Sequence, residues 1–249
     1  MAFGVSVGRT EGFLRSFALV GLDSGGGIRT RDLRVMSPTS YQTAPPRVAL
    51  VNVPEGVRSA PAGPLVLRDD GEMDLIDRYE EAADGFTDRL EAVADDQWSN
   101  RTPCTDWDVR QLVDHVITIQ RQIPDSLDVP VNDDGSDPRT TWKAVRAAAL
   151  TALRQPGVME RTITGIRGEM PVEMALIPRL SDLTVHTWDL ARATGGDERL
   201  SPETAAMVLE RLKPNDEALR ASGSFGPKID PPPGAKAQVE LLCFLGRRP

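Results

Sequence analysis

The chain has 249 residues, of which 40% are hydrophobic and 27% charged, a balance typical of a folded protein with an apolar core. Its net charge is −8, which disfavours nucleic acid or an anionic membrane as partner, because binding either needs a basic face. No run of 18 apolar residues predicts a membrane span, and the two cysteines cannot form a disulfide framework, which indicates a reducing cytoplasm.

Residues 1–72 differ in composition from the rest of the chain. They hold 10 of the 21 glycines and 6 of the 20 prolines, and no apolar periodicity persists in them, which predicts disorder or a linker. Gly27-Ile28-Arg29-Thr30 can also be back-translated as GGG-ATT-CGA-ACC, whose reverse complement resembles the T-loop region of a transfer RNA gene. We therefore expect a disordered segment or a mis-annotated N-terminal extension, with Met73 as the true start and one helical domain over residues 73–249.

Apolar residues at helical spacing recur along this second part of the chain. Asp74 and Thr105 are the expected N-caps of the first two helices. Alternation interrupted by Gly165 and Gly168 predicts a small hairpin within residues 159–172. The predicted helices cover about 75–94, 105–124, 140–154, 174–193, 201–212 and 236–246. Four substantial helices with modest connections predict an all-α fold, a four-helix bundle with a small β-hairpin and extra C-terminal helices.

The chain has only two histidines, His115 and His186, and each lies mid-helix beside the apolar face. Inward positions on two helices of a bundle can converge, and Asp182, four residues before His186, points the same way from its helix. Two imidazoles and one carboxylate suit zinc, nickel or ferrous iron, and three protein ligands leave a position for water or substrate. The same pattern is open to a second interpretation, two hydrogen-bonded core histidines with Asp182 and His186 as a simple intrahelical pair.

Other side chains are weaker candidates. Cys104 precedes a helix N-terminus, where a thiol pKa is lowered, so it is open as a nucleophile or fourth ligand, although about three turns separate it from His115, roughly 16 Å along a helix. Asp189 can orient the second imidazole, or it can be an exposed charge or helix-end contact. Arg179 can bind an anionic substrate or pair with the carboxylate one turn later. Packing roles are predicted for Trp107, Trp188 and Cys243.

Two motifs carry a family resemblance. Residues 102–116, TPCTDWDVRQLVDHV, resemble the "TPC-x-x-W-x-V-x-x-L-x-x-H" stretch of the mycothiol-dependent maleylpyruvate isomerase N-terminal family, and residues 182–195, DLTVHTWDLARATG, resemble its second signature. The C-terminal residues 225–227, FGP, and 241–249, LLCFLGRRP, are also similar to the family. The resemblance covers residues 73–249 and begins at Met73.

This resemblance implies a DinB-like bundle and a divalent metal, most often zinc, held by His115, Asp182 and His186. It also implies mycothiol as cosubstrate, and hence a cytoplasmic thiol transferase or isomerase that acts on a small electrophilic molecule. The isomerase itself has Glu where this chain has Asp182. Three further hypotheses remain open at this point: a hydrolase that uses metal-activated water, a non-catalytic metal-binding scaffold or sensor, and a helical interaction protein with core histidines.

Overall fold

The computed structural model describes residues 73–133, 135, 137–165, 168–221 and 225–249. The predicted disorder of residues 1–72 lies outside the described residues. Within the described ranges, no helix combines the length and apolar character needed to cross a membrane.

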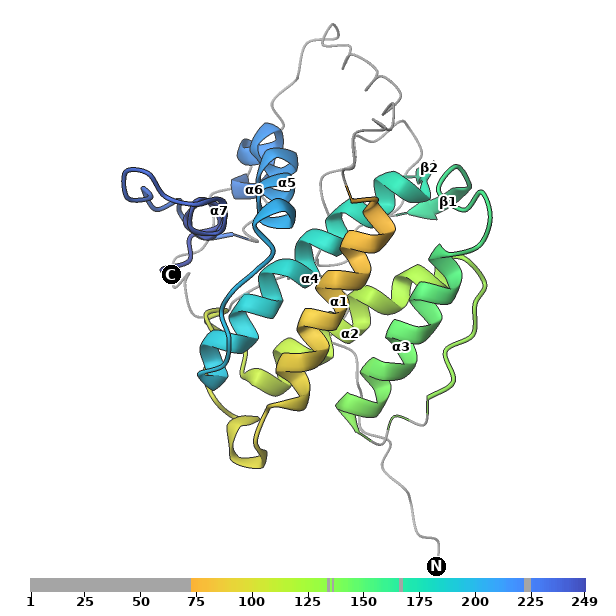
Figure 1. Cartoon of the computed structure of the whole chain (residues 1–249), viewed down its shortest axis with the longest axis horizontal. Helices are drawn as coiled ribbons and strands as arrows, with labels where there is room; N and C mark the ends of the chain where they lie inside the picture. Colours follow the sequence, from red (N-terminus) through yellow and green to blue (C-terminus); the bar gives the residue numbers. More distant parts are fainter. Residues whose placement is uncertain (1–72, 134, 136, 166–167, 222–224) are drawn as a thin grey trace, which may run out of the picture.

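A four-helix bundle forms the main body of the molecule (Figure 1). Its helices are α1 (Leu75–Glu91), α2 (Val109–Ser126), α3 (Pro138–Leu153) and α4 (Val172–Thr194). Helices α1 and α2 each contact both α3 and α4, so the apolar faces of all four meet in one core. The antiparallel hairpin β1 (Thr162–Gly165) and β2 (Gly168–Pro171) joins α3 to α4. The predicted all-α bundle with a small hairpin is confirmed.

Shorter helices follow the bundle and lie together beside it (Figure 1). They are α5 (Pro202–Leu212), α6 (Asp216–Ala221) and α7 (Ala237–Phe244). Helix α5 contacts both α4 and α7, and a second apolar cluster fills the space between them. The predicted extra C-terminal helices are confirmed, whereas α6 and the short 3-10 turns η1 (Asp95–Gln97) and η2 (Lys213–Asn215) were not predicted, because segments this short carry no periodicity.

Helix α4 is the central element of the fold, since residues 180–191 are all buried. Helices α1 and α2 cover part of its surface and α5 covers another part. Its buried hydroxyls are satisfied locally, because Ser181, Thr184 and Thr187 each donate to the carbonyl four residues earlier. Polar residues can therefore sit inside this core helix, and the remaining polar side chains of α4 are free to face a site.

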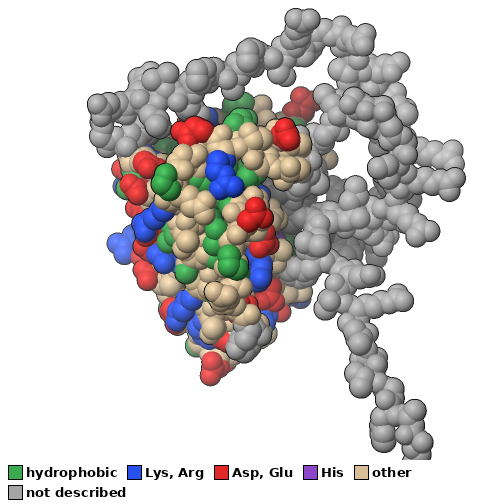
Figure 2. All heavy atoms as spheres, turned by 90° about the vertical axis from the view of Figure 1, so that its right-hand side faces the viewer, with side chains coloured by type: hydrophobic (Ala, Val, Ile, Leu, Met, Phe, Trp, Pro, Cys, Tyr) green, Lys and Arg blue, Asp and Glu red, His purple; other side chains and the backbone are tan. Residues whose placement is uncertain are grey.

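The surface mixes charges of both signs. On the face shown in Figure 2, acidic and basic side chains are interspersed, with hydrophobic side chains between them. Among the described residues visible on this face, charges of one sign form no large patch.

The start of α2 differs from the prediction. Asp108, not Thr105, is the N-cap: its carboxylate accepts from the Gln111 N–H at 2.8 Å, and the Gln111 side chain accepts from the Asp108 N–H at 3.0 Å. Thr105 instead lies in a turn, in which the Trp107 N–H donates to the Cys104 carbonyl. The reciprocal capping box outcompetes the earlier threonine, because it satisfies an orphan donor at each of two positions.

This cap gives a first test of the fold. We expect Asp108→Ala to lower the free energy of unfolding by about 1 kcal/mol, because the first turn of α2 loses its side-chain acceptor. Urea denaturation followed by circular dichroism measures the loss. Asp114→Ala on the exposed side of the same helix is the matched control, and we expect it to stay within about 0.5 kcal/mol of the wild type. Equal losses in both variants would contradict the assigned cap.

Candidate metal centre

The two histidines and Asp182 converge at the interface of α2 and α4. Asp182 Oδ1 lies 3.0 Å from His115 Nε2 and 3.3 Å from His186 Nε2. The two imidazole rings are 5.0 Å apart and nearly perpendicular, at 81°. All three residues are buried. The structure therefore brings these three side chains together, as the bundle geometry predicts.

The donor atoms have the spacing that a small cation needs. The ligand atoms of His115, Asp182 and His186 all lie within 4.8 Å of one another. Tetrahedral ligands at about 2.0–2.1 Å from zinc lie roughly 3.3–3.4 Å apart, close to the distances seen here. Asp182 Oδ2 is buried and has no hydrogen-bond partner, which leaves an anionic acceptor available. The residues present thus fit a divalent ion, and no further protein ligand is required for an open site.

A turn before α2 covers the histidines. Trp107 lies with its ring centroid 4.5 Å from that of His115 and 5.8 Å from that of His186. The Thr102 hydroxyl accepts from the Cys104 N–H at 3.1 Å and lies 2.9 Å from the Trp107 carbonyl, so it ties both ends of this turn together. Trp107 was predicted as a packing residue. Its packing is against the imidazoles, which makes it a wall of the site.

A second group of polar side chains contacts His186 on the Nδ1 side of its ring, opposite Asp182. Asp189 Oδ2 accepts from His186 Nδ1 at 2.9 Å, which matches one of the two roles considered for Asp189. Arg247 binds Asp189 through two hydrogen bonds of 2.7 Å each. Cys104 Sγ lies 3.5 Å from Asp189 Oδ2 and 4.0 Å from His186 Nδ1. The exposed alternative for Asp189 is wrong, since its side chain is fully buried.

The expected separation of Cys104 from the site is also wrong. That expectation counted the distance from Cys104 to His115 as helical rise along the chain. In the structure the thiol instead lies beside His186 of α4. Arg179 does not hold Asp182 directly: its guanidinium donates to the Ala175 carbonyl and to the Gln122 side chain. Two packing predictions hold, because Trp188 and Cys243 are both buried.

Sequence reasoning missed Arg247. The residue lies 58 positions after Asp189, and nothing in its local pattern points to α4. The only available signal was the similarity of the last nine residues to the family, which gave no role to a particular side chain.

Opposing electrostatic effects act on the buried ions. Burial alone would lower the pKa of His186, but the Asp182 charge, with hydrogen bonds to Asp182, Asp189 and Cys104, raises it well above 6.5. Burial would likewise raise the pKa of Asp182, but the two histidines hold it below 3.8. Burial also opposes ionisation of Asp189, and the Arg247 charge outweighs it and keeps that pKa low. The interactions within this cluster therefore favour the charged forms of His186, Asp182 and Asp189.

These shifts predict the pH dependence of the metal-free protein. A raised histidine pKa contributes stability in full below the unfolded value of 6.5, and this contribution is lost as the pH rises through the folded pKa. We expect the free energy of unfolding to fall as the pH rises above about 6.5 in the presence of a chelator. The depressed carboxylates act only at acidic pH, outside this window. Urea midpoints of wild type and His186→Gln measure the effect, and an equal slope in both proteins would refute the assignment.

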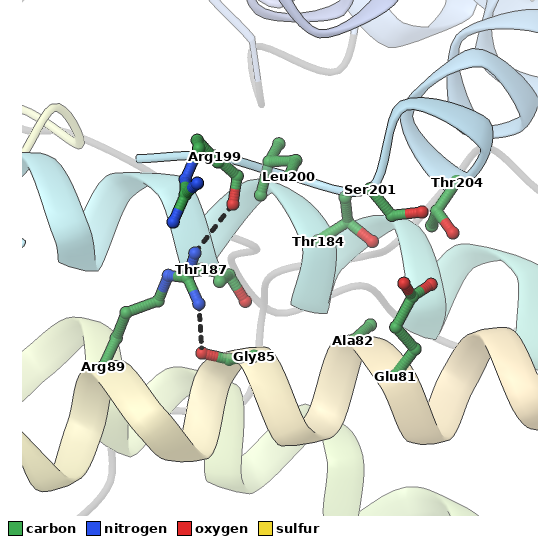
Figure 3. Close-up of a pocket in the computed structure, with 10 residues that line it drawn as sticks. All are labelled: Glu81, Ala82, Gly85, Arg89, Thr184, Thr187, Arg199, Leu200, Ser201 and Thr204. Carbon is green, nitrogen blue, oxygen red and sulfur yellow. Dashed lines mark hydrogen bonds between the residues drawn. The ribbon is translucent and has the colours of Figure 1, made fainter. Parts of the chain in front are cut away.

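A separate pocket of about 180 Å³ lies on another side of α4 (Figure 3). It is bounded by α1, α4 and the start of α5, and Thr184 and Thr187 line it from α4. Arg89 spans one end and donates to the carbonyls of Gly85 and Arg199. None of the three candidate metal ligands lines it.

Fold and site together define a helical-bundle protein with a buried His–Asp–His cluster. The chain belongs to the family of the mycothiol maleylpyruvate isomerase N-terminal domain, whose model matches residues 79–191. It is also 33% identical over 188 residues to two Mycobacterium tuberculosis proteins, Uncharacterized protein MT0763 and Uncharacterized protein Rv0738. Each alignment covers 70% of this chain and 98% of the relative. No solved structure matches the chain significantly. The bundle agrees with a DinB-like fold, and family membership implies a function related to mycothiol.

Proposed function

We propose that this protein binds one divalent ion, zinc in preference to nickel or iron, through His115, Asp182 and His186. We propose further that the site serves a thiol transferase or isomerase that takes mycothiol, or a thiol like it, and a small electrophilic substrate. The observation that carries this proposal is the shared Asp182 Oδ1, which lies within 3.0 and 3.3 Å of the two Nε2 atoms while Oδ2 has no partner.

The chemistry follows from the donor set. A divalent ion held by His115, Asp182 and His186 would act as a Lewis acid and would lower the pKa of a thiol bound beside it, which would favour the nucleophilic thiolate form. Asp182 supplies negative charge in a buried position. A site that includes this carboxylate therefore attracts a cation more strongly than a site made of two neutral imidazoles alone. Trp107 shields the two rings on one side, and Asp189 fixes the second ring through Nδ1. We propose the cytoplasm as the compartment, because thiols are kept reduced there.

One observation favours a second candidate function, a metal-binding scaffold or sensor without catalysis. In the part of the chain that the structure describes, the pocket of about 180 Å³ lies away from the histidines, and the side chains of His115 and His186 are only 7% and 10% exposed. An ion that no substrate reaches would serve structure or sensing.

Ligand exchange separates the two candidates. The full chain is purified without a His tag, its metal content is measured by mass spectrometry, and the metal is replaced by cobalt. We expect added mycothiol to change the visible cobalt spectrum, with a thiolate-to-cobalt charge-transfer band, and a chelator to abolish both the band and any thiol transfer while the fold remains. A bound cobalt whose spectrum never responds to thiol supports the scaffold instead, and activity unchanged in His186→Ala would overturn the enzyme proposal.

A further inference from the structure

Two groups of possible ligands share His186. One contains His115, Asp182 and His186, and the other contains Cys104, His186 and Asp189; within each group the ligand atoms lie within 4.8 Å of one another. The groups use opposite nitrogens of the same ring, since Nε2 faces Asp182 and Nδ1 faces Asp189. One imidazole thus lies between two positions that a cation can take, and its proton decides which nitrogen is free to bind.

Arg247 already occupies the second position with a positive charge. Its Nε and Nη2 bind the two carboxylate oxygens of Asp189 at 2.7 Å each, and Nη2 lies 3.7 Å from Cys104 Sγ. The side chain of Asp189 is fully buried and that of Arg247 only 11% exposed, so water screens this pair weakly. A divalent ion bound to Cys104 and Asp189 would meet the guanidinium at close range.

The C-terminal turn that delivers Arg247 is held at several points. Helix α7 ends at Phe244, and the Arg247 N–H donates to the Leu242 carbonyl at 2.8 Å. Gly246 takes a φ of +79°, and a Cβ there would lie 2.8 Å from the Pro227 carbonyl oxygen, so both the backbone angle and the close approach require glycine. Arg192 also donates to the Arg248 carbonyl. The match to the family model ends at residue 191, so Arg247, which contacts Asp189, belongs to a part of the chain outside that match.

We propose that Arg247 is a positioning residue that selects the metal position. Its guanidinium fixes Asp189 as the acceptor for the Nδ1 proton of His186, which leaves Nε2 for the ion bound with His115 and Asp182. The same guanidinium keeps cations away from Cys104. This inference rests on the proposed metal site, and it adds a residue from the C-terminal turn that sets which ring nitrogen and which partners the ion meets.

Cobalt titration of the full chain tests the proposal. We expect wild type to bind one equivalent without a thiolate-to-cobalt charge-transfer band in the absence of added thiol. Arg247→Met is expected to weaken the histidine–aspartate position by roughly 10–100-fold, as loss of a supporting contact does elsewhere, and to gain a charge-transfer band from Cys104. The double variant Arg247→Met, Cys104→Ser should lose that band. Arg247→Lys, which retains a cation, should not develop it.

Two further variants keep the test decisive. Arg248→Met is the matched control, because the neighbouring side chain is exposed, and it should behave as wild type. Arg247→Gln retains an amide donor toward Asp189, and it replaces Arg247→Met if the latter does not fold. Nitrogen-15 spectra of the zinc-loaded protein should show Nε2 of His186 bound in wild type and a changed pattern in the neutral variants.

The outcomes separate the two proposals. Wild type that takes no cobalt overturns both the metal site and the role of Arg247. One equivalent in wild type, with the same affinity, spectrum and His186 nitrogen signals in the neutral Arg247 variants, overturns only the role of Arg247.

Discussion

His115→Ala and His186→Ala are each expected to abolish stoichiometric metal binding. Each variant removes one of three protein ligands, and each of the two imidazoles lies within 3.3 Å of the shared Asp182 oxygen. Binding free energies at protein zinc sites of about 10–16 kcal/mol divide into roughly 4 kcal/mol per ligand, which is on the order of a thousandfold in affinity. Competition with a chromophoric chelator measures this loss, and mass spectrometry of the purified variants should find less than a stoichiometric amount of metal.

Asp114→Asn is the matched control for these variants. Asp114 precedes His115 on α2, and its carboxylate pairs with Arg110 on the surface, so its charge is removed without contact to the site. We expect one equivalent of metal and unchanged affinity. Full metal binding by both alanine variants would show that the histidines are core residues, the interpretation that the sequence pattern left open.

The three central residues could be found from sequence because helical periodicity is local. His115 and His186 each follow the apolar stripe of a long helix, and α2 and α4 pack together in the bundle, so residues on these stripes must meet. The four-residue spacing of Asp182 and His186 then places both on one side of α4. Element type and facing direction were both contained in short stretches of chain.

The supporting residues could not be found in this way. Arg247 contacts Asp189 across 58 positions, and its placement depends on the close approach of Gly246 to Pro227, a tertiary contact without a local pattern. Cys104 was misplaced because distance was counted along one helix, while the turn from Thr102 to Trp107 folds the thiol toward α4. Propensity predicts elements, whereas these contacts depend on how the connections between elements fold.

Most of the buried polar side chains of α4 find partners close by, so the candidate centre fits inside an otherwise apolar core. Its hydroxyl side chains are satisfied by their own backbone, and the charged side chains Asp182 and Asp189 are matched by the histidines and by Arg247. Buried charges are costly unless they are paired and hydrogen-bonded. Asp182 meets this condition only partly, because Oδ2 has no partner, and a bound cation would complete its pairing.

Metal binding is therefore expected to stabilise the folded chain strongly. With free zinc at about a thousand times the dissociation constant, an ion that binds only the native state adds about 4 kcal/mol to the free energy of unfolding. For a protein of this size, that corresponds to a rise in Tm of roughly 8–16 °C. Thermal unfolding with zinc and with a chelator measures the difference, and His186→Ala should show almost none of it.

The size of this increment should also depend on pH. The Asp182 charge raises the pKa of His186 well above 6.5, so protons and zinc compete for Nε2. The zinc increment is therefore expected to grow as the pH rises above about 6.5, while the metal-free protein loses stability over the same range. A zinc increment that is equal in wild type and His186→Ala, or that shrinks with rising pH, would place the ion elsewhere and leave the buried cluster as a purely structural ion pair.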